Sequence, residues 1–182
     1  MPVDTFDEFV KQRTEQARQF AKALNPKERL ATWKRELDSL YQEMQGYLKD
    51  YIDSGKIKID PRRVQLTENG LGSYEAPALA ILIGRDEVIA EPVAALLIGC
   101  SGRVDLSGPY GILRIVLLEK GGPEEKVTIS GAGSQKETST RSLLRGEIDC
   151  RGWYFVTRPP DAVATPLNAD SFRDAIMDVS GG

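Results

Sequence analysis

The chain of 182 residues is 41% hydrophobic and 28% charged, with a formal net charge of −3. This composition is typical of a globular protein, and the excess of acidic residues disfavours a general nucleic-acid binder, which carries a basic surplus. No histidine is present, so the chain has no Ser-His-Asp triad, no Cys-His dyad and no histidine-based zinc site. Any catalysis would rest on carboxylates, lysine, tyrosine or a hard metal held by carboxylates, and no cofactor is expected.

The first residues, MPVDTFDEFVKQ, are acidic and contain no basic segment followed by an apolar run, so no secretory leader is expected. The longest apolar stretch, EPVAALLIGC, is too short to span a bilayer. Two cysteines do not make a disulfide framework. A bridge between Cys100 and Cys150 is conceivable, but we expect a cytoplasmic protein with reduced thiols and no membrane association.

Residues 1–56 are predicted to form a helical hairpin. Asp4 caps a first helix that ends near Asn25 and has apolar residues at steps of three and four. These residues are Phe6, Phe9, Val10, Ala17, Phe20, Ala21 and Leu24. The run NPKE at 25–28 predicts the start of a second helix, because asparagine caps, proline suits the first helical position and glutamate completes a capping box.

The second predicted helix spans residues 26–54 and carries the strongest periodic signal in the chain. Its apolar seam consists of Leu30, Trp33, Leu37, Leu40, Met44, Tyr47 and Tyr51. At about 1.5 Å per residue this helix is roughly 43 Å long, which exceeds the span of a small sheet. Two uses of the seam are open: packing against the first helix within the chain, or an interaction surface towards another subunit or a protein partner.

From residue 57 onward the apolar period changes from helical to alternating, which predicts strands. Their connections are too short for parallel crossovers, so a mostly antiparallel sheet of about six to eight strands is expected. Pro61 interrupts the first strand and suits an edge strand or a bulge. A polar loop is expected over 131–142. The segment LNADSFRDAIMDV predicts a C-terminal amphipathic helix capped near Asn168 or Asp170.

This order of elements places the chain in the α+β class, with an N-terminal helical hairpin, a mostly antiparallel sheet and a C-terminal amphipathic helix. Residues 1–56 are the helical hairpin segment, and residues 57–182 are the antiparallel-sheet domain with its C-terminal helix. Since no long linker separates the two segments, we expect them to form one continuous structural unit.

The segment IGCSGRVDLSGPYG, which we name the Gly99–Gly111 corner, resembles an active site more than any other part of the chain. A cysteine or serine between glycines at a strand end is a common way to present a nucleophile. Cys100, Ser101 and Asp105 are therefore weak catalytic candidates, with Arg103 beside them. The favoured interpretation is structural: Cys100 is a packed thiol where the chain turns from one strand into the next.

Other reactive groups have less support. The loop SGAGSQKETST lacks the consecutive Gly-Lys-Ser/Thr of a phosphate-binding loop. Asp86, Glu87, Glu91 and Asp105 surround the same turn region as the corner, and two of them together would suit Mg²⁺ or acid–base work. Acids in such turns are more often solvated. The sequence therefore assigns no metal and no cofactor site.

The favoured function is a non-catalytic cytoplasmic protein-interaction module, in the manner of an adaptor, a chaperone-like protein or an immunity-like binding protein. The missing catalytic set, the long helix and a sheet edge near Pro61 favour it. The alternative is an enzyme or small-ligand binder that uses carboxylates or a thiol at the Gly99–Gly111 corner. A third hypothesis is a structural homodimer paired through residues 30–51. The expected partner is a protein or a second copy, nucleic acid is not expected, and a small-molecule ligand stays open.

Overall fold

A computed structural model describes residues 25–95, 97, 99–129 and 137–182 of the chain. The helices in these ranges are α2 Pro26–Tyr47, α3 Lys49–Asp53 and α4 Ala169–Ser180. The first helix predicted over residues 4–25, and with it the predicted helical hairpin, lies outside the described residues.

In the described residues, the strands form one large sheet and one separate hairpin. The large sheet has seven strands in the order β1-β2-β3-β4-β5-β8-β9, and all neighbouring strands are antiparallel. Its strands are β1 Ile57–Glu68, β2 Gly72–Ile83, β3 Asp86–Ala94, β4 Arg103–Gly108, β5 Gly111–Leu118, β8 Gly152–Val156 and β9 Ala164–Pro166. The α+β class and the mostly antiparallel sheet are confirmed, and β1 lies at an edge of the sheet, as Pro61 suggested.

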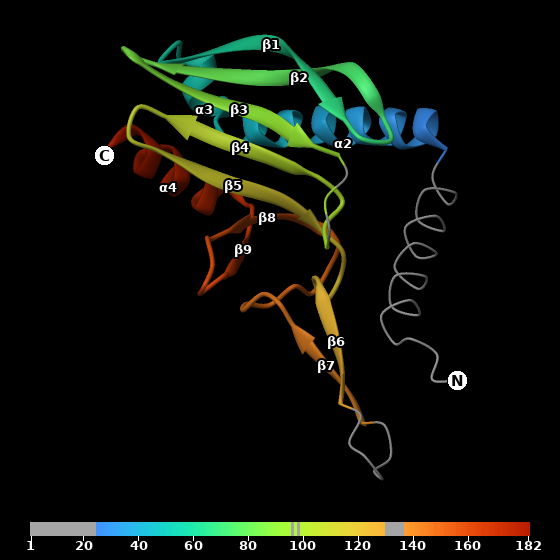
Figure 1. Cartoon of the computed structure of the whole chain (residues 1–182). Helices are drawn as coiled ribbons and strands as arrows, with labels where there is room; N and C mark the ends of the chain where they lie inside the picture. Colours follow the sequence, from blue (N-terminus) through green and yellow to red (C-terminus); the bar gives the residue numbers. More distant parts are fainter. Residues whose placement is uncertain (1–24, 96, 98, 130–136) are drawn as a thin grey trace, which may run out of the picture.

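The separate hairpin consists of β6 Glu124–Ile129 and β7 Glu137–Ser142. It projects away from the large sheet (Figure 1). The polar loop predicted over 131–142 is therefore wrong for its second half, which is a strand. The sequence ETSTRS in β7 has no apolar alternation, so its strand state depends on cross-strand pairing with β6 rather than on a burial pattern.

Helix α2 begins where the sequence predicts and ends earlier. The Asn25 side chain accepts a hydrogen bond from the Lys27 backbone N–H, and Pro26 occupies the first turn. The helix is interrupted at Leu48, so the single helix predicted over 26–54 is in fact α2 followed by the short α3. Gly55, with a φ of 73°, ends α3 in the left-handed conformation that glycine adopts without strain.

The helices α2 and α4 pack on one face of the sheet (Figure 1), and a single core joins them to it. From α2 the core takes Trp33, Leu37, Leu40, Tyr41 and Met44. From α4 it takes Phe172, Ala175, Ile176 and Val179. The C-terminal helix is confirmed, since Asn168 caps α4 through a complete capping box. Because the core spans both predicted segments, the described parts of residues 1–56 and 57–182 pack together.

A split between β2 and β3 shapes the sheet beneath α2. Pairing of these strands stops after Leu79 and Ala90, and β2 then follows β1 away from β3. The Tyr41 hydroxyl of α2 enters this split and donates towards the carbonyl oxygens of Pro77 and Ala90, at 3.1 and 3.2 Å. Further along, the Glu68 carboxylate accepts a hydrogen bond from the Ala95 backbone N–H. At the split, the Pro77, Ala90 and Ala95 backbone groups thus have side-chain partners in place of strand pairing.

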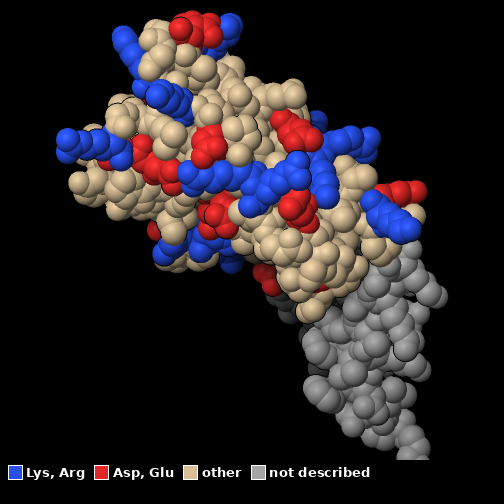
Figure 2. Space-filling view, turned by 90° about the horizontal axis from the view of Figure 1, so that it is seen from above, with Lys and Arg blue, Asp and Glu red and all other residues tan. Residues whose placement is uncertain are grey.

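The opposite face of the sheet carries charged residues. Arg62 of β1 reaches across to Glu87 of β3 with two hydrogen bonds of 2.9 and 2.6 Å. On the surface seen in Figure 2, Lys and Arg are mixed with Asp and Glu, and no large field of one sign appears there. At the β5–β8 end of this face, a small apolar cluster forms around Leu118, Ile148 and Tyr154.

Candidate functional site

The Gly99–Gly111 corner is closely packed. Gly102 has a φ of 151°, and a Cβ atom at this position would lie 2.1 Å from the Trp33 ring of α2. A Cβ at Gly99 would lie 2.9 Å from Pro123. These glycines therefore let the backbone approach neighbouring side chains, which is a structural reason for the glycine-rich sequence.

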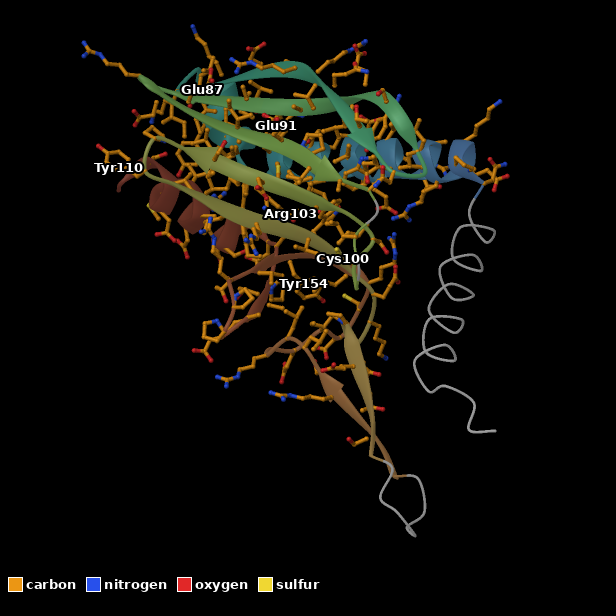
Figure 3. The ribbon with its side chains drawn as sticks, in the orientation of Figure 1. Glu87, Glu91, Cys100, Arg103, Tyr110 and Tyr154 are labelled. Atoms are coloured by element: carbon orange, nitrogen blue, oxygen red, sulfur yellow. The ribbon has the colours of Figure 1, made fainter. Side chains whose placement is uncertain are left out.

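Cys100 is half-buried in this corner and packs against the apolar cluster around Leu118 and Tyr154. Burial raises the pKa of its thiol above the ordinary value, although Arg103 and Arg29 act in the opposite direction. A raised pKa keeps the sulfur protonated at neutral pH, and a protonated thiol is a poor nucleophile. Figure 3 shows Cys100 beside the end of the sheet, before β4 begins.

Ser101 has a carboxylate neighbour that the sequence did not indicate. Its Oγ donates a hydrogen bond of 3.0 Å to Glu119, and Arg151 donates to the same Glu119 oxygen at 3.0 Å. The Ser101 carbonyl oxygen accepts a hydrogen bond of 2.8 Å from Arg29 of α2. These contacts tie the corner to α2 and to the loop before β8, and they occupy the polar atoms of Ser101.

Arg103 and Asp105 form a bidentate ion pair along β4, with two N–O distances of 2.7 Å. Asp105 lies directly opposite Glu91 on β3 and opposite Arg114 on β5. Figure 3 shows Glu87 and Glu91 along β3 and Arg103 on β4. Among the described residues, no group of three or more Cys, Asp or Glu side chains is arranged to hold a metal ion.

The two cysteines are both free thiols. Cys150 is exposed, and its Sγ lies 3.9 Å from the Tyr154 hydroxyl. The neighbouring Arg151 pairs with Glu36 at 2.8 Å and with Glu119 at 3.0 Å. The Arg151 guanidinium, which is next to Cys150 in the sequence, is therefore paired with these two carboxylates.

The predicted apolar seam divides into two parts in the structure. Trp33, Leu37, Leu40 and Met44 are at most 1% exposed and pack on the chain's own sheet. Tyr51, at the end of the seam, is 43% exposed. Leu30 and Tyr47 are partly buried at the margin of the core. The part of the seam that remains open to a partner is therefore its C-terminal end.

That end of the seam borders an apolar groove between α3 and α4, with a volume of about 620 Å³. Ile57 of β1 and Ile83 of β2, which are cross-strand partners, line the groove from the sheet. The remaining lining residues come from the segment 48–56 and from α4: Leu48, Tyr51, Lys56, Asp170, Arg173, Asp174, Ile176 and Met177. We name this surface the α3–α4 groove.

Charged groups surround the apolar lining of the α3–α4 groove. Arg173 donates a hydrogen bond of 2.8 Å to the Tyr47 carbonyl oxygen, so α4 is joined to the C-terminal end of α2. Asp170 and Asp174 lie on the α4 side, and Lys56 lies before β1. The groove therefore combines an apolar interior with charges of both signs at its margin, an arrangement suited to an amphipathic ligand.

Sequence reasoning did not find this groove, because its lining comes from segments that are far apart in the chain. One signal was present: the sequence places Phe172, Ile176 and Val179 on one apolar face of the C-terminal helix, and Met177 is a large apolar residue outside that face. In the structure it is 51% exposed at the groove, while Ile176 beside it is buried.

No helix in the described part of the chain is both long enough and apolar enough to cross a membrane. The described fold is an α+β protein with a seven-stranded antiparallel sheet. Comparisons of the chain with protein-family models, with curated proteins and with solved structures gave no match.

Proposed function

We propose that this protein is a non-catalytic cytoplasmic protein-interaction module that binds an amphipathic segment of a partner protein in the α3–α4 groove. The observation that carries the proposal is the groove itself, in which Tyr51 and Met177 are large, apolar and about half exposed beside the floor of Ile57 and Ile83. Exposed apolar surface that is contiguous and rimmed by charge is characteristic of interaction sites.

The shape and lining of the groove suit a helical ligand. Two elements, α3 and α4, form its sides, and an amphipathic helix commonly binds in such a groove through apolar residues at helical spacing. Tyr51 and Met177 add an aromatic ring and a flexible thioether, two side-chain types that are enriched at protein interfaces. The charges of Lys56 and Asp174 at the margin would orient the ligand rather than supply most of its affinity.

The alternative, an enzyme or small-ligand site at the Gly99–Gly111 corner, has less support. Cys100 has a raised pKa, Ser101 is hydrogen-bonded, and Asp105 is paired with Arg103. An acid–base or nucleophilic site needs a reactive group with room for a substrate beside it. The packing of the corner against Trp33 and Pro123 argues against such room.

A pull-down with two matched variants tests the proposal. Met177→Glu places a charge at the α3–α4 groove, while Ile112→Glu places one on β5, outside the groove lining. The two side chains are 51% and 52% exposed, so both substitutions are expected to leave folding largely unchanged. The tagged full-length chain and both variants are incubated with a native lysate, and the retained proteins are identified by mass spectrometry.

We expect a stoichiometric partner with the unmodified chain and with Ile112→Glu, and its loss with Met177→Glu. Circular dichroism and thermal unfolding of the three proteins show whether the fold is intact. Equal retention by Met177→Glu and by the unmodified chain would overturn the groove as the binding site. Absence of any stoichiometric partner would contradict the function as a whole.

A further inference from the structure

We propose that two copies of this protein form a symmetric dimer through the sheet face opposite the helices, centred on β4. The helices α2 and α4 pack on the other face (Figure 1), which also carries the α3–α4 groove. The inference is therefore independent of the proposed function. The dimer surface consists of two rows of side chains across β3, β4 and β5, which we name the β3–β5 face. Its residues are Ile89, Glu91, Asp105, Ser107, Ile112 and Arg114.

The charged row of the β3–β5 face contains two groups without an ion pair. Asp105 on β4 lies between Glu91 on β3 and Arg114 on β5. Both Asp105 carboxylate oxygens accept hydrogen bonds from Arg103, which follows on the same strand (Figure 3). In the part of the chain that the structure describes, Glu91 and Arg114 form no ion pair, and the Arg114 Nε is buried without a hydrogen-bond partner. Such a buried N–H is unfavourable, and so are two carboxylates directly opposite each other on neighbouring strands.

The second row of the β3–β5 face is apolar at both ends. Ser107 on β4 lies between Ile89 on β3 and Ile112 on β5. The Ile112 side chain is about half exposed, and Ile89 and Ser107 are partly exposed. Strands β3 and β5 thus each present one isoleucine at the same level, and one level further β3 presents an acid where β5 presents a base.

A two-fold axis parallel to β4 makes this face complementary to itself. Rotation about such an axis places β3 of one copy over β5 of the other and preserves the level along the strands. Glu91 then meets Arg114 of the partner subunit, and Ile89 meets Ile112 of the partner subunit. Each contact occurs twice, as in any isologous interface. Two sheets packed face to face lie about 10 Å apart, and a glutamate and an arginine together bridge that separation with charge-assisted hydrogen bonds.

The order of the charges selects this axis over the other face-to-face arrangement. An axis in the sheet plane but perpendicular to the strands would place each strand over its own copy. Glu91 would then face Glu91 of the partner subunit, and the two Arg114 side chains would face each other, which is repulsive at both contacts. With the axis parallel to β4, the side chain that faces its own copy is Asp105, and its charge is already compensated by Arg103. A foreign protein would need the reversed order of charges, which this face itself supplies.

Charge reversal combined with mixing tests the dimer. Sedimentation equilibrium of the full-length chain between about 1 and 100 μM gives its mass and its dissociation constant. Glu91→Arg places like charges in both Glu91–Arg114 contacts, and Arg114→Glu does so with the opposite sign. When the two variants are mixed, each reversed side chain faces a side chain of opposite charge. Asp178→Arg, a reversal at an exposed position of α4, is the matched control.

We expect the unmodified chain and Asp178→Arg to sediment at twice the chain mass. Each of the other two reversals should weaken the dimer at least about 100-fold, because the symmetry changes two contacts at once. An equimolar mixture of these two variants should recover a dimer with one copy of each, which native mass spectrometry identifies. Since mixing does not refold a misfolded variant, this recovery separates recognition from loss of the fold.

Four results would overturn the inference: a monomeric unmodified chain, single reversals that stay dimeric, a mixture of folded variants that stays monomeric, or a dimer that dissociates only with Met177→Glu. The last result would place the second copy in the α3–α4 groove. If circular dichroism shows that a single variant does not fold, the chain with both reversals replaces it. That chain should dimerise with itself and not with the unmodified chain, and mixed dimers between them would contradict the proposed contacts.

The dimer and the proposed function fail separately. Ile112→Glu introduces a charge into the apolar row and should dissociate the dimer, while the groove on the other sheet face stays accessible. This variant therefore remains the control for partner retention by the groove. A monomeric chain that still loses its partner with Met177→Glu refutes only the dimer. A dimer with the expected response to charge reversal, but with no effect of Met177→Glu on partner retention, refutes only the groove.

Discussion

The Gly99–Gly111 corner and the α3–α4 groove differ in how visible they are in the sequence and in how open they are in the structure. The corner is a continuous run of residues with the appearance of a nucleophile site, yet Gly102 lies against Trp33 and Gly99 lies against Pro123. The groove has no motif and is assembled from the segment 48–57, Ile83 and α4, yet it holds about 620 Å³ of largely apolar space.

The difference teaches that a glycine-rich strand end has two physical explanations. Glycine permits the backbone to approach a substrate, and it equally permits the backbone to approach the protein's own side chains. At Gly102 the neighbour is an indole ring from α2, so the corner serves packing. A reactive interpretation of such a motif needs evidence of open space, which the sequence does not contain.

The largest expected effect tests the packing of the corner. Gly102→Ala should lower the free energy of unfolding by about 3 kcal/mol, because the new Cβ overlaps the Trp33 ring at a φ of 151°. Gly111→Ala is the matched control, since no atom lies within 4 Å of its Cβ position, and its change should stay within about 1 kcal/mol. Urea unfolding of both variants measures the two values. Similar small changes would mean that the corner is not closely packed on α2.

The next-largest loss of stability is expected at the split between β2 and β3, where Tyr41 packs on the sheet face that also carries the groove. Tyr41→Phe removes the hydroxyl that bridges the Pro77 and Ala90 carbonyl oxygens, and we expect a loss of about 1–2 kcal/mol. Tyr110→Phe, at a tyrosine that is 75% exposed, is the control. A loss for Tyr41→Phe no larger than the control's would contradict a structural role for this hydroxyl.

The burial of Tyr41 also predicts that the free energy of unfolding depends on pH. Burial, and then the charges of Glu91 and Asp38, raise the pKa of this hydroxyl in the folded state. Above about pH 10 the unfolded chain loses a phenolic proton that the folded chain keeps, so stability falls as pH rises, by up to about 1.4 kcal/mol per pH unit. Below the ordinary tyrosine pKa both states are protonated and the group contributes no slope. Unfolding between pH 9 and 11 should therefore show a flatter decline for Tyr41→Phe than for the unmodified chain.

A smaller effect on stability is expected from the Arg103–Asp105 ion pair, which lies on the sheet face opposite the helices. A double-mutant cycle with Arg103→Gln and Asp105→Asn should give a coupling free energy of about 0.5–1 kcal/mol at low salt. The pair is partly shielded, with side chains 27% and 21% exposed, so some coupling should persist at higher salt. No measurable coupling at any salt concentration would mean that the bidentate geometry adds nothing to stability.

The last prediction concerns the reactivity of the Cys100 thiol rather than the stability of the fold, and it gives the sharpest contrast between corner and groove. In the Cys150→Ser variant, Cys100 should react with a disulfide reagent at neutral pH roughly tenfold more slowly than a small free thiol, because burial raises its pKa and restricts access. Its rate should increase as pH rises through that raised pKa. A rate at pH 7 above that of the free thiol would instead favour the alternative function at the corner.

The predictions from sequence succeeded where a local rule acts within one element. The capping residues Asn25 and Asn168 begin α2 and α4, and the short turn at Gly84 joins β2 to β3 as an antiparallel hairpin. The predictions were wrong where no local signal exists. The break at Leu48 lies inside an unbroken apolar period, and β7 has a polar sequence whose strand state depends on its partner β6.

The candidate sites show the same difference between residue types, which are visible in the sequence, and contacts between distant residues, which are not. The sequence named Cys100, Ser101 and Asp105 from their types and spacing, but it contained no information on Glu119 beside Ser101 or on Trp33 beneath Gly102. Similarly, the apolar seam was visible in the sequence as a pattern, whereas the surface against which it packs was not. Seam residues from Trp33 to Met44 pack on the chain's own sheet, and Tyr51 extends past it to the groove.

By itself, the sequence determined the α+β class, the antiparallel pairing, both helix caps and the lack of histidine chemistry. These properties depend on residue type and on spacing within one element or one short connection. Only the tertiary structure decided which apolar residues are covered and which remain open. Coverage depends on where α2 is interrupted, where β2 leaves β3 and how α4 crosses the sheet, and these are outcomes of packing between distant segments. For this reason the corner that looked reactive is filled, and the groove that no motif marked is open.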